Sequence, residues 1–233
     1  MPTTYYKIHG GRVSVAEYWR MSPNLIAFAI AVGLKPFGGF PFNFSIPRVE
    51  TLYELDWDDL PPVAVRQFKE PLQQFERAGY DYLFAHEMPL LERNRLAVAA
   101  ILIAKDALSF ALVAYVQEPN VRQRQCACIS LFDDETIGVT TTAKRMLNSS
   151  PKYRTQRYIG ARADVLSEHH KVHLANADAE CSIRPVRLDP AAVRRAVLDG
   201  EQTVVDFNVE RRVFIPMAKA EIQRLRDAHA DDD

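Results

Sequence analysis

A series of apolar and alternating segments between residues 80 and 144 is the feature that most constrains the fold. Short polar turns separate the last three segments, and two of these turns read EPN and DDE. Strands joined by such short turns pair as antiparallel neighbours, because a parallel pair needs a crossover of about a dozen residues or more. The sequence therefore predicts an antiparallel meander of four to five strands, at residues 80–88, 95–105, 108–117, 121–132 and 136–144.

Helical segments flank this block on both sides. Apolar residues share one face of a predicted helix that follows the Pro61–Pro62 pair and ends near Gly79. Residues 161–176 and 189–200 predict two more helices, and the last is started by Asp-Pro and stopped by glycine. The order predicts an α+β fold, in which the meander sheet carries helices on one face and C-terminal helices follow. The expected core is Phe68, Leu72, Phe75, Leu83, Ile101, Val113, Tyr115, Ile129 and Leu131.

The length of 233 residues fits one large domain with extensions. We expect an apolar and Pro-rich N-terminal extension at residues 1–60, an α+β core domain at 61–180 and a C-terminal helical extension at 181–233. The formal net charge of −1 gives no overall attraction to nucleic acid or acidic membranes. Three cysteines, an odd number, and a polar start that does not resemble a secretory signal indicate a cytoplasmic location.

The segment LIAFAIAVGL, residues 25–34, is apolar throughout except for its glycine. A membrane-spanning helix needs about 20 such residues, and Lys35 and Pro36 interrupt the run too early. A buried helix or strand is the preferred interpretation. The alternative is a peripheral membrane contact at residues 25–44, supported by four aromatic residues: Phe37, Phe40, Phe42 and Phe44.

Two histidines four residues apart, His169 and His173, raise the question of a metal site. This spacing places both on one helical face, as in zinc clamps, but no glutamate lies between them. Cys126 and Cys128 share one face of a predicted strand and are the candidate further ligands. The simpler interpretation, which we prefer, is that the histidines pack against the sheet and the cysteines are small core residues. We expect no metal and no cofactor.

The segment from 136 to 163 contains six basic residues and no acidic one. Its 144–162 part predicts a polar loop with an anionic partner such as phosphate, single-stranded nucleic acid or lipid headgroups. The alternative is a solvated loop whose charges pair with the acidic turn at 133–135. The candidate anion-binding residues are Lys144, Arg145, Lys152, Arg154 and Arg157.

Several short motifs occur in a definite order: a PP pair before a helix, FERAGYDYL, a strand pair, ISLFDDETIGVTTT, a basic loop and LSEHHKVHL. Over about residues 46–176 this order resembles an uncharacterised family of bacterial proteins. The resemblance implies an α+β domain that a membrane anchor often precedes. It implies no activity.

Phosphate-binding glycine motifs and the GxSxG nucleophile motif are absent from the sequence. The first hypothesis is therefore a non-enzymatic binding or interaction protein, with membrane association as an added option. A metal-dependent, hydrolase-like enzyme that uses His169 and His173 is the first alternative. The second is a small-ligand-binding module, in which the meander and the 161–176 helix enclose an apolar pocket.

Overall fold

The computed structural model of the chain describes residues 4–39, 45–92, 95–118 and 121–227. It has an α+β architecture built on a seven-stranded sheet, in the order β3-β4-β5-β6-β7-β8-β9. Neighbours from β3 to β8 are antiparallel, and β8 and β9 run parallel. The strands are β3 (Tyr53–Leu55), β4 (Tyr80–Glu87), β5 (Leu96–Ala104), β6 (Phe110–Glu118), β7 (Val121–Leu131), β8 (Ile137–Thr141) and β9 (Tyr153–Arg157).

The predicted meander of four to five strands is wrong for the sheet as a whole, although its five segments correspond to β4–β8. The sheet gains one strand at each edge. β3 is only three residues long and lies in an acidic, turn-like connector. β9 has the sequence YRTQR, whose basic and polar side chains are all half-buried. Neither strand has the apolar alternation by which a strand is recognised in sequence.

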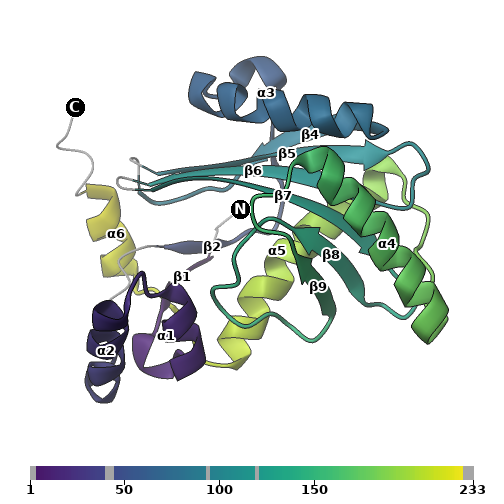
Figure 1. Ribbon diagram of the computed structural model, residues 1–233. Coiled ribbons are helices and arrows are strands. Elements are labelled where there is room, and N and C mark those ends of the chain that lie inside the picture. The colour runs from purple at the N-terminus through teal and green to yellow at the C-terminus, as the bar shows by residue number, and fades with distance from the viewer. Residues whose placement is uncertain (1–3, 40–44, 93–94, 119–120, 228–233) are drawn as a thin grey trace.

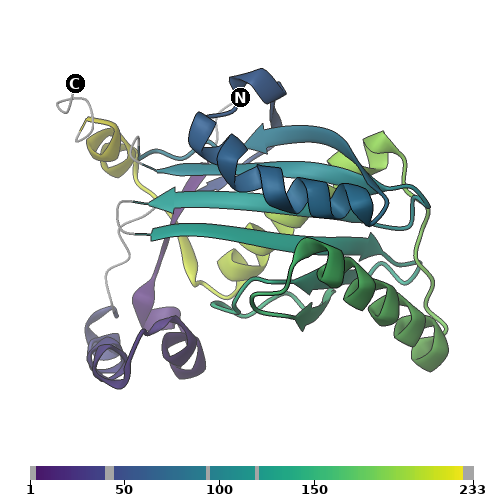
Figure 2. The same ribbon diagram turned by 45° about the horizontal axis from the view of Figure 1, so that its top comes forward.

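Helices cover both faces of this sheet, which corrects the prediction of helices on one face. α3 (Pro62–Arg77) and α4 (Ala163–Cys181) lie on one face, and α5 (Pro190–Glu210) crosses the other (Figures 1 and 2). The central strands alternate accordingly, so that Val113 packs with α3 and α4 whereas Phe110 packs with α5. Strands covered on both sides are apolar on both faces, which explains the continuous apolar runs in the sequence.

α3 follows its predicted boundaries closely. It begins at Pro62, where the missing N–H is tolerated, and it ends before Gly79, whose φ is 91°. Phe68 and Phe75 are completely buried on its inner face. Each contributes about 1.5–3 kcal/mol through removal of its ring from water.

The buried face of α4 agrees only in part with the one expected. Leu166, His170 and His173 are buried, whereas Val165 and Val172 are 44% and 57% exposed. His169 is only half-buried and its ring stacks on Tyr158, at a centroid distance of 3.8 Å. Adjacent histidines satisfy the helical spacing equally well, so the sequence does not decide which one faces the sheet.

A second, three-stranded sheet joins the two ends of the chain. Its order is β10-β1-β2, with both pairs antiparallel. The predicted N- and C-terminal extensions therefore contact each other, and α5 packs on the sheet of the predicted core domain. The elements of this region are β1 (Thr4–Ile8), α1 (Val15–Met21), α2 (Leu25–Gly33), β2 (Ile46–Arg48), β10 (Phe214–Pro216) and α6 (Lys219–Asp227). Within the described residues, 3-10 turns also occur at Gly10–Arg12, Lys35–Phe37 and Trp57–Asp59.

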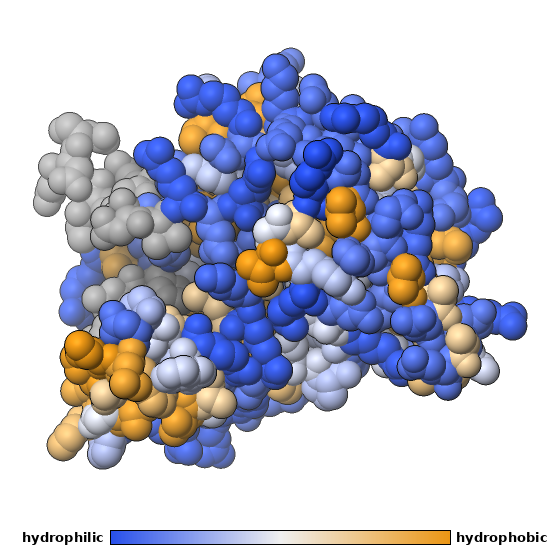
Figure 3. Space-filling model, in the orientation of Figure 1, coloured by the Kyte–Doolittle hydropathy of each residue, from blue (hydrophilic) through white to orange (hydrophobic). Residues whose placement is uncertain are grey.

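α2 is not the buried element that its sequence predicts. Of its nine residues only Ala31 is buried, while Leu25 and Ile26 are 67% and 74% exposed. Figure 3 shows an apolar patch over α1 and α2 at the lower left. No helix among the described residues has the length and apolar character needed to span a bilayer. Phe40, Phe42 and Phe44 lie outside the described residues.

Candidate functional site

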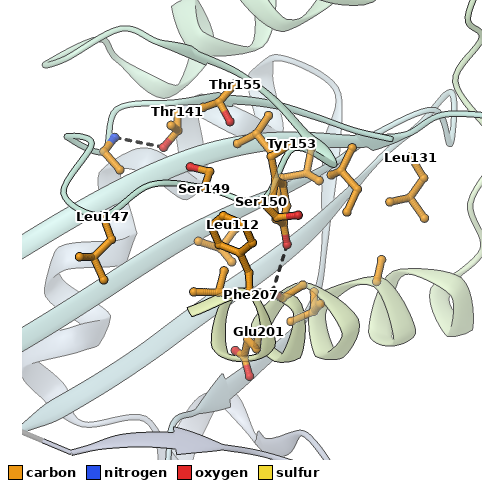
Figure 4. A pocket seen from close by; sticks show the side chains of 18 of the residues that line it. Leu112, Leu131, Thr141, Leu147, Ser149, Ser150, Tyr153, Thr155, Glu201 and Phe207 are labelled. Carbon is orange, nitrogen blue, oxygen red and sulfur yellow. Dashed lines mark hydrogen bonds between the residues drawn. The ribbon is translucent and has the colours of Figure 1, made fainter. Parts of the chain in front are cut away.

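A cavity of about 410 Å³ lies between strands β6–β9 and α5. It is on the sheet face opposite α4, so the 161–176 helix does not enclose it as predicted. Most of its lining is aliphatic or aromatic, and Figure 4 shows the side chains from both layers. The apolar wall includes Leu112, Ile129, Leu131, Val139, Val204 and Phe207.

Small residues on α5 leave room for the cavity. Ala196 and Gly200 lie one helical turn apart and both line it. Tyr153 reaches from β9 to α5, where its hydroxyl donates to the Gly200 carbonyl oxygen at 3.1 Å (Figure 4). A glycine inside a helix costs about 1 kcal/mol relative to alanine. α5 carries this unfavourable glycine at the point where it borders the cavity.

The 142–152 loop, which joins β8 to β9, forms one end of the cavity. Leu147 of this loop packs into the apolar cluster of the N-terminal region. Its neighbour Asn148 donates its backbone N–H to Glu17 of α1 at 2.7 Å. Both contacts tie the cavity end to α1, although more than a hundred residues separate the two segments.

Glu17 is a completely buried carboxylate at this junction. It accepts hydrogen bonds from the backbone N–H groups of Ser14 and Asn148 and two from Nη2 of Arg211, at 2.7–2.8 Å. Burial raises the pKa of Glu17, but the hydrogen bonds from Asn148, Ser14 and Arg211 outweigh it and lower the pKa to about 2. Glu17 is therefore charged in the folded protein, and its hydrogen bonds link α1 to the 142–152 loop and to Arg211 at the end of α5.

Three arginines gather at the loop end of the cavity. Arg20 of α1 and Arg145 of the loop both donate to Oδ1 of Asn148, at 2.7 and 3.1 Å. Arg157 of β9 lines the cavity itself, as Asn148 does. Burial, followed by the positive charges of Arg145 and Arg20, lowers the pKa of the Arg157 guanidinium. Burial and Arg145 also lower the pKa of Arg20.

Two of these arginines have an unused donor. Nε of Arg157 and Nε of Arg20 are buried without a hydrogen-bond partner. Within the described part of the chain, none of Arg20, Arg145 and Arg157 forms an ion pair with a carboxylate. Arg20 and Arg157 are half-buried and Arg145 is exposed, so a positive region without a carboxylate in contact among the described residues lies at the cavity end.

One more titratable residue, Glu201 of α5, lines the cavity. The carboxyl of Glu201 lies 3.5 Å from Nε2 of His86 on β4. In Figure 4 this carboxyl points away from Tyr153, on the far side of the helix. Burial raises the pKa of Glu201 to about 7 and lowers that of His86 to about 4.

The histidines of α4 form a directional hydrogen-bond chain. Ser130 donates its hydroxyl proton to the Leu108 carbonyl at 2.7 Å, so it accepts from Nε2–H of His170 at 3.0 Å. Nδ1 of His170 then accepts from the hydroxyl of Thr140, at 2.9 Å, and Thr140 accepts from Nδ1–H of His173, at 3.2 Å. Both ring nitrogens of His170 are occupied. Burial lowers its pKa to about 3.

The four candidate metal ligands do not form one site. His169 stacks on Tyr158, and His173 is part of the hydrogen-bond chain. Cys126 and Cys128 share a strand face as expected, in the core cluster beneath α3 and α4, where burial raises their pKa values to about 11 and 12. In residues 4–39, 45–92, 95–118 and 121–227, no three His, Cys, Asp or Glu side chains come together as a metal site.

The five candidate anion-binding residues divide into two groups. Arg145 and Arg157 lie at the cavity end. Arg154 instead pairs with Asp134 at 3.2 Å, and Lys144 and Lys152 are exposed. Reasoning from the sequence missed Arg20 and Asn148. Arg20 comes from α1, and its role depends on a contact that sequence spacing does not reveal.

No family model, no curated protein and no solved structure matches this chain. The resemblance to a bacterial family therefore stays a prediction. A function for this protein has to be inferred from the geometry and charge of the cavity.

Proposed function

We propose that the protein is a non-enzymatic binding protein for a small, largely apolar ligand, held between the sheet and α5. The cavity of about 410 Å³ carries this proposal. Its size falls within the range of about 300–1,000 Å³ that is usual for ligand sites. Its lining is also usual for such sites, since apolar walls are combined with a few polar groups at one end.

Two half-buried core residues support the same proposal. Ile129 and Leu131 lie on the sheet face that α5 covers, yet neither is fully buried because both border the cavity. A ligand that covers them removes apolar surface from water, at about 25 cal/mol for each Å². The ligand thus completes a core that the protein alone leaves partly open.

The test is to fill the cavity from within. Ala196→Phe places a ring in the cavity, whereas Ala191→Phe adds the same ring at an exposed position of the same helix. Native mass spectrometry of the purified protein should find a bound small molecule in the parent and in Ala191→Phe, and should lose it in Ala196→Phe. In calorimetry on delipidated protein, dodecanol should bind to the parent and to Ala191→Phe more tightly than to Ala196→Phe. Equal dodecanol binding by the two variants would contradict the proposal.

A second candidate function is peripheral contact with a lipid surface through α1 and α2. Trp19, Ile30 and Phe37 are 58%, 54% and 86% exposed and extend the patch formed by Leu25 and Ile26. A short helix with apolar and aromatic residues on its surface is typical of segments that lie in a membrane interface. The patch adjoins the cavity end through Arg20 of α1, which would place a lipid-like ligand near its source.

Vesicle sedimentation tests this contact. The double variant Ile26→Ser, Ile30→Ser should reduce binding to phosphatidylcholine vesicles by about tenfold, since two exposed aliphatic side chains that enter the lipid in this proposal are lost. Val172→Ser, at an exposed apolar position on α4, is the matched control and should bind as the parent does. A parent protein that stays in the supernatant would refute the contact.

A further inference from the structure

We infer that Arg20, Arg145 and Arg157 bind the oxyanion head group, a carboxylate or a phosphate, of an amphiphile whose chain occupies the cavity. This inference rests on the proposed apolar ligand site and names the chemical class of its ligand. It also gives a role to a charge cluster that the fold leaves unbalanced.

The first step of the argument is convergence. Arg20 and Arg145 meet on a single amide oxygen, Oδ1 of Asn148, at 2.7 and 3.1 Å. Two cations that share one neutral acceptor repel each other and are held together by the surrounding fold. Arg157 is near enough that both charges lower its pKa, so the three guanidinium groups form one positive region.

The second step concerns charge balance. The carboxylate of Glu17, whose charge acts on Arg20, already accepts two hydrogen bonds from Arg211 and two from backbone N–H groups. Its charge opposes the lowering of the Arg20 pKa by burial and Arg145, but it forms no ion pair with Arg20. Across the described residues, then, no carboxylate directly neutralises the cluster, and an external anion would do so.

The third step concerns donors. Nε of Arg157 is buried without a partner, and this residue lines the cavity. The planar guanidinium presents its N–H groups as a fork that matches the two oxygens of a carboxylate or phosphate. An oxyanion at this end would satisfy a donor that the protein itself leaves unpaired.

The fourth step joins the charge to the cavity. Arg157 and Asn148 are polar members of a lining that is otherwise mostly apolar, and both lie at the 142–152 loop end. A ligand with its anion there must extend along the apolar side chains of Leu112 and Phe207 (Figure 4). An anionic head with an aliphatic chain fits both ends, whereas a free inorganic anion would leave the apolar part open.

The experiment compares three ligands of equal chain length by calorimetry on the full chain: dodecanoate, dodecyl phosphate and dodecanol. The anionic ligands should bind the parent at least tenfold more tightly than dodecanol. Arg157→Gln should weaken the preferred anion by about 10- to 100-fold, as expected for loss of a charge-assisted hydrogen bond, and leave dodecanol within about twofold. Arg145→Gln, at an exposed position, should also weaken the binding of this anion. The preferred anion then identifies a carboxylate or a phosphate ligand.

Arg154→Gln is the matched control, because this arginine lies on the same strand but is paired with Asp134. It should bind all three ligands as the parent does. Equal affinity for dodecanol and both anions, with no effect of Arg157→Gln or Arg145→Gln, would overturn the head-group inference and leave the cavity proposal standing. If none of the three ligands binds, the cavity proposal fails as well.

Discussion

Oε1 of Glu201 on α5 lies 3.5 Å from Nε2 of His86 on β4, and the side chains are 21% and 3% exposed. Burial acts on both groups in favour of the neutral form. It raises the pKa of Glu201 to about 7 and lowers the pKa of His86 to about 4, although the charge of Glu54 opposes the latter shift. Between these values neither group is charged, and Nε2 of His86 is buried without a hydrogen-bond partner.

Glu201→Gln should therefore change how stability depends on pH. The folded protein holds the Glu201 proton up to a pH of about 7, whereas the unfolded chain releases it near 4.5. The stabilisation that comes from this proton is complete below about 4.5 and is lost as the pH rises through 7. The variant should match the parent near pH 4.5 and be more stable by about 3 kcal/mol near pH 8. Urea unfolding across this range measures the difference.

The control for this variant is Glu210→Gln, at an exposed position of the same helix. It should follow the parent at every pH. If Glu201→Gln and the parent lose stability in parallel from acid to alkaline pH, the carboxyl of Glu201 is in contact with water in the folded protein and the buried pair with His86 does not form.

His170→Ala should destabilise the protein more than His169→Ala does. His170 is 1% exposed and both of its ring nitrogens are hydrogen-bonded, to Ser130 and Thr140. Its removal leaves a cavity and takes one hydrogen bond each from Ser130 and Thr140, and should lower the free energy of unfolding by about 3 kcal/mol or more. His169→Ala loses only a stacking contact with Tyr158 and should cost about 1 kcal/mol. Equal losses in denaturant titrations would contradict the assignment.

The sequence identified the strands β4–β8 because apolar alternation and short turns are local signals. It could not identify β9, since YRTQR becomes a strand only through parallel pairing with β8. The choice between His169 and His170 also depends on tertiary packing, because both fit a helical face. Of the predicted core residues, Phe68, Ile101 and Val113 are fully buried, a result that periodicity anticipates.

The candidate site was less accessible to reasoning from the sequence. Arg145 and Arg157 stood out as part of a basic segment, but their partner Arg20 lies on α1, far away in the chain. Ile129 was predicted as ordinary core. It lies at an open cavity instead, because the small residues of α5 stand opposite it. A pattern of apolar residues indicates which side faces inward, but not whether that side is filled.

Gly138→Ala should destabilise the protein although it adds only one methyl group. A Cβ atom at this position on β8 would lie 2.7 Å from Cε2 of Phe132, whose ring is buried. The ring or the strand must shift, which should lower the free energy of unfolding by about 1–3 kcal/mol. Gly33→Ala is the matched control, since nothing lies within 4 Å of its Cβ position at the end of α2. It should be neutral or stabilise the protein by up to about 1 kcal/mol. Similar melting temperatures for the two variants would contradict the close approach of Phe132.

Glu17→Gln should weaken both the fold and the ligand site. Glu17 is charged in the folded protein down to a pH of about 2, whereas its unfolded pKa is near 4.5. The stabilisation from this carboxylate is present above about 4.5 and is lost as the pH falls toward 2, by about 3 kcal/mol. The variant lacks this acid-dependent loss and is less stable than the parent at neutral pH, because Arg211 loses its buried partner.

The same variant loosens the 142–152 loop, since the backbone of Asn148 is held by Glu17. Asn148 in turn positions Arg20 and Arg145, so dodecanoate should bind more weakly while the apolar walls stay intact. Calorimetry at a temperature where the variant is folded measures this effect, and Glu210→Gln again serves as the control. Unchanged dodecanoate affinity in a destabilised Glu17→Gln protein would show that the contact between α1 and the loop supports the fold without organising the arginines.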